Sequence, residues 1–254
     1  MKLILLTIYN SFKRNGFIPT VIKIINYPLI IFKRRKFLIM SSEERFNWIY
    51  KNNHWKNDES LSGPGSTLKA TENLRKKLPK ILSTYKIGSV LDAPCGDFNW
   101  MKFLLPTINV NYIGGDIVNE MVDSLNSKYT SENVKFIKLD IRNDRLPYVD
   151  LLISRDFLFH LPYSDIYNVL ENFINSKIPY LLTTTHKNKN DFKNRNLQVG
   201  EVFRKIDLFS HPFDFPISPL ARFDDWVVPD AEREMCLFSR EQILSIIASS
   251  SLSS

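Results

Sequence analysis

The stretch SVLDAPCGDFNWM, residues 89–101, reads as an apolar strand that runs into a tight turn and then a helix. A dinucleotide-binding turn of this kind carries several glycines, because its backbone approaches a pyrophosphate closely. Here Pro94 and Phe98 stand where glycines would be expected, and Gly96 is the glycine that remains. The turn is therefore expected to hold a ligand other than a dinucleotide.

Short apolar runs and helical stretches alternate on both sides of this turn. Strands are expected at 87–92, 111–116, 134–139, 149–154 and 179–185, with a last one near EMCLFS at 234–239, and helices at 98–105, 118–128 and 163–174. Strands separated by helical stretches need crossover connections, which produce a parallel sheet. The pattern predicts an α/β fold with a Rossmann-like, doubly wound, mostly parallel sheet and an N-terminal helical extension.

Length and composition allow one such domain plus accessory structure, since the chain has 254 residues of which 44% are hydrophobic. The expected segments are a basic apolar leader at 1–40, a helical cap at 41–85, the α/β domain at 86–245, and a Ser-rich frayed tail at 246–254. The two cysteines, Cys95 and Cys236, are far apart and fit neither a disulfide framework nor a zinc site. This cysteine usage indicates a reducing, cytoplasmic compartment.

The net charge of +7 comes from the leader, because residues 1–40 hold eight basic residues and no acidic one. A nucleic-acid enzyme would spread its basic residues over a working face, so no nucleic-acid partner is expected. The apolar stretch at 17–32 is interrupted by prolines and a lysine and falls short of the roughly 20 residues that a spanning helix needs. Two interpretations stay open: an interfacial segment that contacts an anionic inner-membrane surface, or a pair of helices packed on the domain.

Acidic residues follow the predicted strands at the edge where a doubly wound sheet binds its ligand. Asp92, Asp116 and Asp140 each close an apolar run, and Asp97 lies in the turn itself. A carboxylate would repel a pyrophosphate, whereas S-adenosylmethionine has no phosphate and carries an ammonium and a sulfonium. We expect Asp116 to bind the ribose hydroxyls and Asp140 to bind the adenine amine. The sequence thus predicts S-adenosylmethionine as the cofactor.

The motifs VLDAPCGDFNWM, YIGGDI, LDI and DLLISRDFLFHLP together resemble those of the class I S-adenosylmethionine-dependent methyltransferases. SGPGSTLKATENLRKKLP, YLLTTTH and GEVFRKIDLFSHPFDFP are more narrowly similar to a little-characterised bacterial and viral group associated with surface-glycan assembly. The resemblance covers most of residues 45–240 and departs from the family's Gly-x-Gly at Pro94 and Phe98. It implies that the cofactor contacts lie at Asp92, Ala93, Gly96, Asp97, Asp116, Ile117, Asp140, Ile141 and Arg155.

Methyl transfer to a hydroxyl benefits from a general base near neutrality, and the fourth predicted strand delivers candidates in ISRDFLFHLP. We expect His160 to be this base, with Asp156 either orienting it or acting as the base itself, and His186 as the next candidate. Structural roles for all three, as an ion pair or as packed histidines, remain the alternative. No cluster of metal ligands is visible, so no metal is expected.

The aromatic and acidic segment 209–226 suits either sugar binding or core packing. The function that best fits these patterns is O-methylation of a sugar hydroxyl in a glycan or glycan precursor, with a small-molecule or glycan acceptor. Two other functions remain: a non-catalytic membrane-docking module that keeps the fold, and a nicotinamide-dependent oxidoreductase. Asp97 and Phe98 in the turn disfavour the oxidoreductase.

Overall fold

The structure is a computed structural model that describes residues 37, 40–189, 191–198 and 201–251. By its internal contacts the chain divides into two units, residues 1–41 with 198–201, and residues 42–197 with 202–254. The predicted leader therefore lies almost entirely outside the described residues. Everything below concerns the second unit. No helix among the residues described is both long and apolar enough to cross a bilayer.

The second unit alternates strands and helices along the chain. Its helices are α3 (Ser42–Lys51), α4 (Glu72–Thr84), α5 (Met101–Leu104), α6 (Asn119–Tyr129), α7 (Tyr163–Asn175) and α8 (Arg240–Ser251). Its strands are β1 (Ser89–Asp92), β2 (Asn111–Asp116), β3 (Val134–Lys138), β4 (Leu151–Ser154), β5 (Tyr180–His186), β6 (Ala221–Asp224) and β7 (Arg233–Ser239). Short 3-10 turns lie at Pro64–Ser66, Leu105–Thr107 and Leu158–His160.

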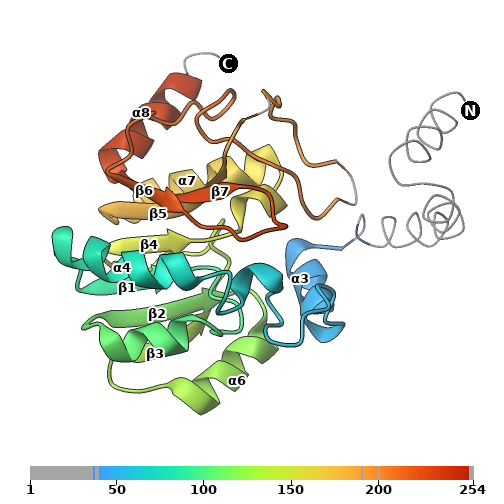
Figure 1. Ribbon diagram of the computed structural model, residues 1–254, viewed down its shortest axis with the longest axis vertical. Helices are drawn as coiled ribbons and strands as arrows, with labels where there is room; N and C mark the ends of the chain where they lie inside the picture. Colours follow the sequence, from blue (N-terminus) through green and yellow to red (C-terminus); the bar gives the residue numbers. More distant parts are fainter. Residues whose placement is uncertain (1–36, 38–39, 190, 199–200, 252–254) are drawn as a thin grey trace, which may run out of the picture. The chain divides into compact units, whose positions relative to one another are not determined.

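The described strands form one sheet in the order β3-β2-β1-β4-β5-β7-β6 (Figure 1). The first five strands of the chain are parallel, with Asp92 of β1 opposite Gly114 of β2 and Ile153 of β4. Strand β7 runs antiparallel between β5 and β6. The order reverses at β1, so the turn after β1 and the loop after β4 meet at the switch point where such sheets bind ligands. The predicted Rossmann-like, mostly parallel sheet is confirmed.

Alternate strand residues supply two cores, one on each face of the sheet. Leu91, Leu152 and Phe238 pack with α7 and α8 on one face. Val90, Leu151 and Leu237 pack with α4, α5 and α6 on the other. Helix α7 shows how the sequence produces this layer, because its buried residues recur at helical spacing: Ile166, Val169, Leu170, Phe173 and Ile174. Burial of each such side chain stabilises the fold by about 1.5–3 kcal/mol.

Helix α4 lies in the segment expected to be a helical cap at 41–85, and it packs into this layer. Its buried residues lie in the same core as the strand residues: Leu74, Leu78, Ile81 and Leu82. Helix α4 and the strands also belong to the same compact unit. The apolar spacing of α4 predicted a helix correctly. Which surface that helix covers depends on contacts far along the chain, including those with β6.

Three further elements differ from expectation. The helix expected at 98–105 begins only at Met101 and covers four residues, because Phe98 has a positive φ of 61° that an α-helix does not allow. Strand β6 was not predicted. The tail expected to fray from residue 246 is helical through Ser251, since Ile243 and Ile246 are buried against the core.

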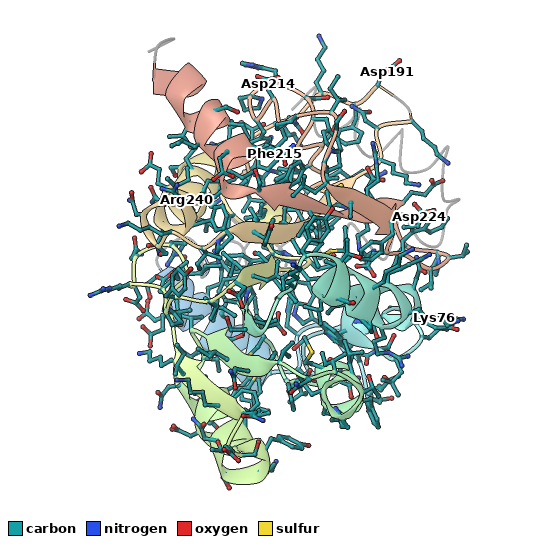
Figure 2. All side chains as sticks on the ribbon, turned by 90° about the vertical axis from the view of Figure 1, so that its left-hand side faces the viewer. Lys76, Asp191, Asp214, Phe215, Asp224 and Arg240 are labelled. Atoms are coloured by element: carbon teal, nitrogen blue, oxygen red, sulfur yellow. The ribbon has the colours of Figure 1, made fainter. Side chains whose placement is uncertain are left out.

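Two phenylalanines of the aromatic segment 209–226 lie in the core rather than in a ligand site. Phe213 and Phe215 are buried, and the Phe215 ring packs edge-on against Phe238 with centroids 5.1 Å apart. The neighbouring Asp214 lies at the surface beside them (Figure 2). Apolar packing, the second of the two interpretations of this segment, therefore accounts for its buried aromatic residues.

Candidate active site

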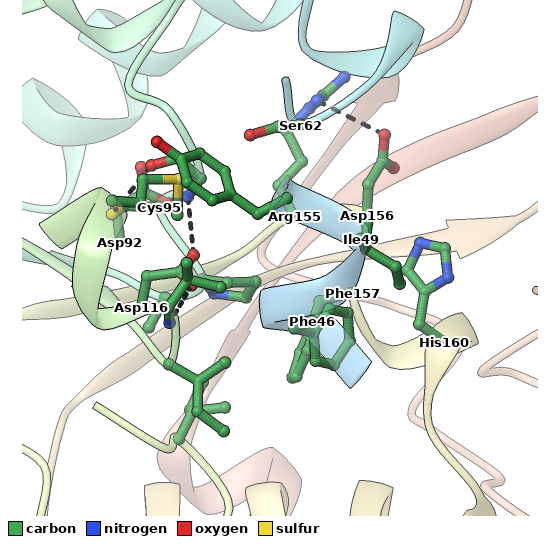
Figure 3. Close-up of a pocket in the computed structure, with 18 of the residues that line it drawn as sticks. Phe46, Ile49, Ser62, Asp92, Cys95, Asp116, Arg155, Asp156, Phe157 and His160 are labelled. Carbon is green, nitrogen blue, oxygen red and sulfur yellow. Dashed lines mark hydrogen bonds and ion pairs between the residues drawn. The ribbon is translucent and has the colours of Figure 1, made fainter. Parts of the chain in front are cut away.

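A pocket opens at the carboxyl ends of β1, β2, β3 and β4, as expected for this topology. Eight of the nine expected cofactor residues line it: Asp92, Ala93, Gly96, Asp116, Ile117, Asp140, Ile141 and Arg155. Two of the three expected catalytic residues, Asp156 and His160, also line it. In Figure 3, Asp92 and Asp116 lie on one side of the pocket and Asp156 and His160 on the other. Asp97 and His186 are not part of the lining.

Asp116, the last residue of β2, holds the turn after β1 in place. One carboxylate oxygen accepts the Gly96 N–H at 3.1 Å, and the other accepts the Val118 N–H at 3.0 Å. Burial raises the pKa of the Asp116 carboxyl to about 6, although these hydrogen bonds lower it. Gly96 has a φ of 56°, and a Cβ on it would lie 2.1 Å from the Ser62 Oγ, so glycine is required at this position.

Asp92 ends β1 and is 2% exposed. One of its oxygens accepts the Tyr112 hydroxyl at 2.9 Å. Burial raises the pKa of the Asp92 carboxyl to about 7, against the opposing effects of the Tyr112 hydrogen bond and the Arg155 charge. A buried carboxylate with so few partners is a good site for a cationic ligand group, which would lower its pKa again.

Asp97 has a structural function that the sequence did not indicate. Its carboxylate accepts hydrogen bonds from the Ser60 Oγ at 3.0 Å, the Leu61 N–H at 2.7 Å and the Ser62 Oγ at 3.2 Å. It therefore anchors the loop at 60–62, of which Leu61 and Ser62 line the pocket. The prediction that Asp97 contacts the cofactor is not supported by this geometry, because its carboxylate faces the loop.

Phe98 also departs from the sequence interpretation, in which it would obstruct a ligand. Its ring is 3% exposed and packs on Tyr112 and Phe136, at centroid distances of 5.4 and 4.9 Å. It is absent from the pocket lining and obstructs nothing there. Instead, the late start of α5 at Met101 removes the helix N-terminus that a pyrophosphate would need next to Gly96.

Asp140 lines the pocket, but its oxygens are already used. Arg142 donates to both of them, from Nε at 2.8 Å and from Nη2 at 2.6 Å, and Asn143 donates at 3.1 Å. Burial raises the pKa of the Asp140 carboxyl, but the hydrogen bonds from Arg142 outweigh burial and leave the pKa lowered. The expected bond from Asp140 to an adenine amine would have to compete with Arg142, which the sequence analysis missed.

Arg155 and Asp156 belong to a buried cluster of four charges. Arg155 donates from Nε to Asp225 at 2.7 Å and from Nη1 to the Gly65 carbonyl at 2.9 Å. Arg233 binds both oxygens of Asp156, at 2.9 and 3.0 Å. Burial raises the pKa of the Asp156 carboxyl, but Arg155 and Arg233 outweigh burial and the pKa is lowered. A carboxylate held in this way is a poor general base, so the alternative in which Asp156 acts as the base is not supported.

His160 presents a neutral imidazole to the pocket. Its Nδ1 is hydrogen-bonded to the Val202 carbonyl oxygen. Because a carbonyl only accepts, Nδ1 carries the proton and Nε2 keeps its lone pair. Burial lowers the pKa of His160 to about 4, against the opposing Val202 bond and Asp156 charge. The residue that orients His160 is therefore Val202 rather than Asp156.

His186 has the opposite arrangement. The Ile206 N–H donates to its Nδ1 at 3.2 Å, so the proton lies on Nε2. The side chain is buried, and its ring packs on Phe159 with centroids 5.1 Å apart. Burial lowers the pKa of His186 to about 4. Outside the pocket and in this tautomer, His186 is a packed core histidine and not a catalytic candidate.

The sequence analysis missed the residues that close the pocket from the N-terminal side. Phe46, Ile49 and Tyr50 of α3 and Trp55 of the following loop line it. The Trp55 and His160 rings are 5.5 Å apart. The spacing of Phe46, Ile49 and Tyr50 could have predicted an apolar face on this helix. No local sequence pattern indicated that this face would lie next to the residues after β4. Across the described part of the chain, no group of three or more His, Cys, Asp or Glu could hold a metal ion.

Comparison with known proteins agrees with this geometry. Residues 90–176, less than half of the chain, match the family model of a methyltransferase domain. No curated protein matches the sequence. A SAM-dependent methyltransferase from Leishmania major is similar in structure, with a TM-score of 0.55, 13% identity, and coverage of 80% of this chain and 88% of that one.

Two further structures contain S-adenosylhomocysteine. The N-methyltransferase NodS from Bradyrhizobium japonicum has a TM-score of 0.51 and 11% identity, covering 75% of this chain and 97% of its own. The DhpI complex has a TM-score of 0.51 and 15% identity, covering 79% and 97%. At these identities the likeness concerns the fold. Residues 90–176 thus match a methyltransferase domain, and the described residues have the Rossmann-like class I fold.

The residues in the pocket suit S-adenosylmethionine, the cofactor that the sequence predicts and that the matched methyltransferase domain supports. Two buried carboxylates with raised pKa values, Asp92 and Asp116, fit a ligand that carries positive charge and ribose hydroxyls. A pyrophosphate would be repelled by the same two groups. The geometry therefore does not favour a nicotinamide-dependent oxidoreductase.

Proposed function

We propose that this chain is an S-adenosylmethionine-dependent methyltransferase that methylates a hydroxyl group of a sugar, in a glycan or glycan precursor. The observation that carries the proposal is His160. Its Nδ1–H is held by Val202, so a neutral Nε2 remains available in the same pocket as Asp92 and Asp116. A pocket with a cation site at one side and a neutral base at the other suits methyl transfer to a group that must lose a proton.

When bound, S-adenosylmethionine would supply a methyl group on a sulfonium, whose leaving group is the neutral thioether of S-adenosylhomocysteine. The acceptor oxygen forms the new O–C bond, and the hydroxyl proton passes to the His160 Nε2. Because Nδ1 is already protonated, the product is an imidazolium that the Val202 carbonyl and the nearby Asp156 charge stabilise. Positioning is the other main contribution, which α3 and the loop around Trp55 provide by closing the pocket.

A sugar is favoured as the acceptor by the rings beside His160. Trp55 lies 5.5 Å from the His160 ring, and Phe46 and Tyr50 line the same pocket. Sugar rings pack their axial C–H groups on aromatic faces while their hydroxyls form hydrogen bonds. The resemblance to a group associated with surface glycans supports the same acceptor class, whereas no residue of the segment 209–226 lines the pocket.

The experiment compares one substitution at two histidines. His160→Asn keeps a side-chain N–H for the Val202 carbonyl and removes Nε2, whereas His186→Asn keeps an acceptor for the Ile206 N–H. Transfer of labelled methyl groups from S-adenosylmethionine is measured on a panel of nucleotide sugars and oligosaccharides. We expect His160→Asn to lower turnover by roughly 10²–10⁴-fold with unchanged S-adenosylhomocysteine affinity. Equal turnover in both variants would contradict the assignment of the base.

We also propose that residues 1–40 bring the enzyme to the cytoplasmic face of an anionic membrane, where glycan precursors are assembled. The support is the sequence alone, in which eight basic residues alternate with apolar runs and no acidic residue occurs. Sedimentation with vesicles that contain phosphatidylglycerol tests this. Deletion of residues 1–40 should abolish binding and spare methyl transfer to a soluble acceptor. An insoluble truncated chain would show that the leader packs on the domain instead.

A further inference from the structure

Arg204 is a buried arginine outside the pocket lining that binds the backbone directly beside His160. It is 2% exposed. Its backbone N–H donates to the Phe159 carbonyl at 3.3 Å, and its Nη1 donates to the same carbonyl at 3.0 Å. Because Phe159 directly precedes His160, these two bonds fix Arg204 next to the proposed base. Burial of a guanidinium is costly, so its bonds here indicate a demand for precise local structure.

The same guanidinium holds two further segments. Its Nε donates to the Arg195 carbonyl at 2.8 Å, and the charged group lies 5.4 Å from the centroid of the Tyr163 ring. Tyr163 is the first residue of α7. The planar fork of an arginine suits this arrangement, because its nitrogens donate in fixed directions to more than one carbonyl. Arg204 therefore connects residue 195, the start of α7 and the turn that carries His160.

The backbone around Arg204 receives no support from a helix or strand of its own, since residues 202–207 belong to neither. Strand β5 holds one end of this segment. The His186 N–H donates to the Ile206 carbonyl at 2.8 Å, and the Ile206 N–H donates back to the His186 Nδ1 at 3.2 Å. Arg204 lies between this anchor and Val202, so it is placed to set the position of the carbonyl that orients the base.

We propose that Arg204 is a positioning residue for His160. Its bonds to two backbone carbonyls place the Val202 carbonyl against the His160 Nδ1, which keeps the lone pair on Nε2. The inference rests on the proposed function, since it concerns the base of that reaction. Without the Val202 carbonyl, a neutral imidazole exchanges its proton between both nitrogens, and a protonated Nε2 has no lone pair for the acceptor proton. The Arg204 charge also contributes to the lowered pKa of His160.

The tautomer of His160 is read directly from the side-chain ¹⁵N resonances of the full chain at about pH 8, where the imidazole is neutral. The chain has four histidines, and the spectrum of His160→Asn identifies the His160 signals. We expect the wild-type chain to show a protonated Nδ1 and an unprotonated Nε2 at His160. A wild-type spectrum with the proton on Nε2 would overturn the proposal, whatever the variants show.

Arg204→Gln and Arg240→Gln are the matched variants. Arg240 at the start of α8 (Figure 2) also donates from its backbone N–H and its Nε to carbonyls, those of Pro179 and Ile174, but at the opposite edge of the sheet, where β5 begins. We expect Arg204→Gln to place the His160 proton mainly on Nε2 and to lower kcat by roughly 10-fold or more, with unchanged S-adenosylhomocysteine affinity. Arg240→Gln should change neither the tautomer nor kcat.

Arg204→Lys separates position from charge and replaces Arg204→Gln if that variant does not fold. It keeps the positive charge, but its single nitrogen cannot occupy the positions of Nε and Nη1 at once. We expect the same change of tautomer as in Arg204→Gln. Wild-type behaviour of Arg204→Lys would assign the effect to charge and refute positioning, as would an unchanged tautomer in folded Arg204→Gln. Absence of methyl transfer by the wild-type chain would instead contradict the proposed function, and the tautomer comparison alone then decides the role of Arg204.

Discussion

Arg233 binds both carboxylate oxygens of Asp156, at 2.9 and 3.0 Å. Because this ion pair favours the charged carboxylate, Asp156 is a poor proton acceptor. The pair joins β7 to the loop after β4, so it fixes the antiparallel end of the sheet against the pocket. Gly65 lies directly on it, since a Cβ there would be 2.8 Å from the Asp156 Oδ2. The Asp156–Arg233 pair thus determines where the loop at 62–66 can lie.

Asp156→Ala should destabilise the protein because, within the described part of the chain, it leaves the buried Arg233 with only the longer contact to Asp230, at 3.4 Å. Removal of one partner of a buried pair costs about 3–5 kcal/mol in the free energy of unfolding. Urea unfolding followed by circular dichroism measures this loss. Glu72→Gln, which breaks the exposed pair with Lys76, is the control and should leave the midpoint almost unchanged. A similar midpoint for both variants would refute a structural role for the Asp156 pair.

The pH dependence of turnover should reflect the lowered pKa of His160. Burial brings that pKa to about 4, so the imidazole is already neutral, with its Nε2 lone pair free, throughout the range from about pH 5 to 9. At saturating cofactor, where Asp92 is expected to be ionised against the ligand ammonium, turnover should be nearly constant over this range. A rise centred near the ordinary histidine value of about 6.5 would show that the His160 pKa is not lowered.

Asp92 should make the unliganded protein less stable as the pH rises. Its pKa is about 7 in the folded chain and about 3.9 when unfolded, so between these values the folded state binds more protons and stability falls with increasing pH. Asp92→Asn keeps an acceptor for the Tyr112 hydroxyl and removes this dependence. We therefore expect the variant to gain thermal stability over wild type at pH 8 and to show little gain at pH 4. The same difference at both pH values would contradict the raised pKa.

Cofactor affinity should fall when the same groups are protonated. Asp92 and Asp116 have pKa values of about 7 and about 6, so acidification from pH 8 to pH 5 neutralises the carboxylates that attract the ligand cation. Calorimetry at these two pH values should give weaker S-adenosylhomocysteine binding at pH 5, with proton uptake visible as buffer-dependent enthalpy. In Asp92→Asn both the affinity change and the buffer dependence should shrink.

Asp97→Ala should release the loop that covers the pocket. The substitution removes three acceptor contacts, to Ser60, Leu61 and Ser62. Amide hydrogen exchange at 60–66 should become faster, and S-adenosylhomocysteine should dissociate more rapidly, by roughly 10-fold or more if one charge-assisted bond of about 1.5 kcal/mol is lost. Asp123→Ala, on the exposed face of α6, serves as the control. Unchanged exchange in the loop would refute the anchoring function of Asp97.

Most of the fold could be predicted from local sequence. Short apolar runs predicted β1 to β5 to within two residues at each end, since β1, β2, β4 and β5 are buried over almost their whole length. Strand β6 was not predicted because its four residues, ARFD, include few apolar residues and are only partly buried at the sheet edge. The helix after the turn was predicted too early, because the positive φ of Phe98 is imposed by packing on Tyr112 and Phe136.

The sequence by itself determined that Asp92, Asp116, Arg155 and His160 come together, because each ends or follows a parallel strand and parallel strands end at one edge of the sheet. Only the tertiary structure decided what each group does there. Ser60 and Ser62 occupy the Asp97 carboxylate, and Val202 sets the tautomer of His160. Hydrogen bonds of this kind link residues tens of positions apart, and burial shifts the pKa values of the buried carboxyl and imidazole groups. Both effects depend on the folded environment, which local sequence patterns do not encode.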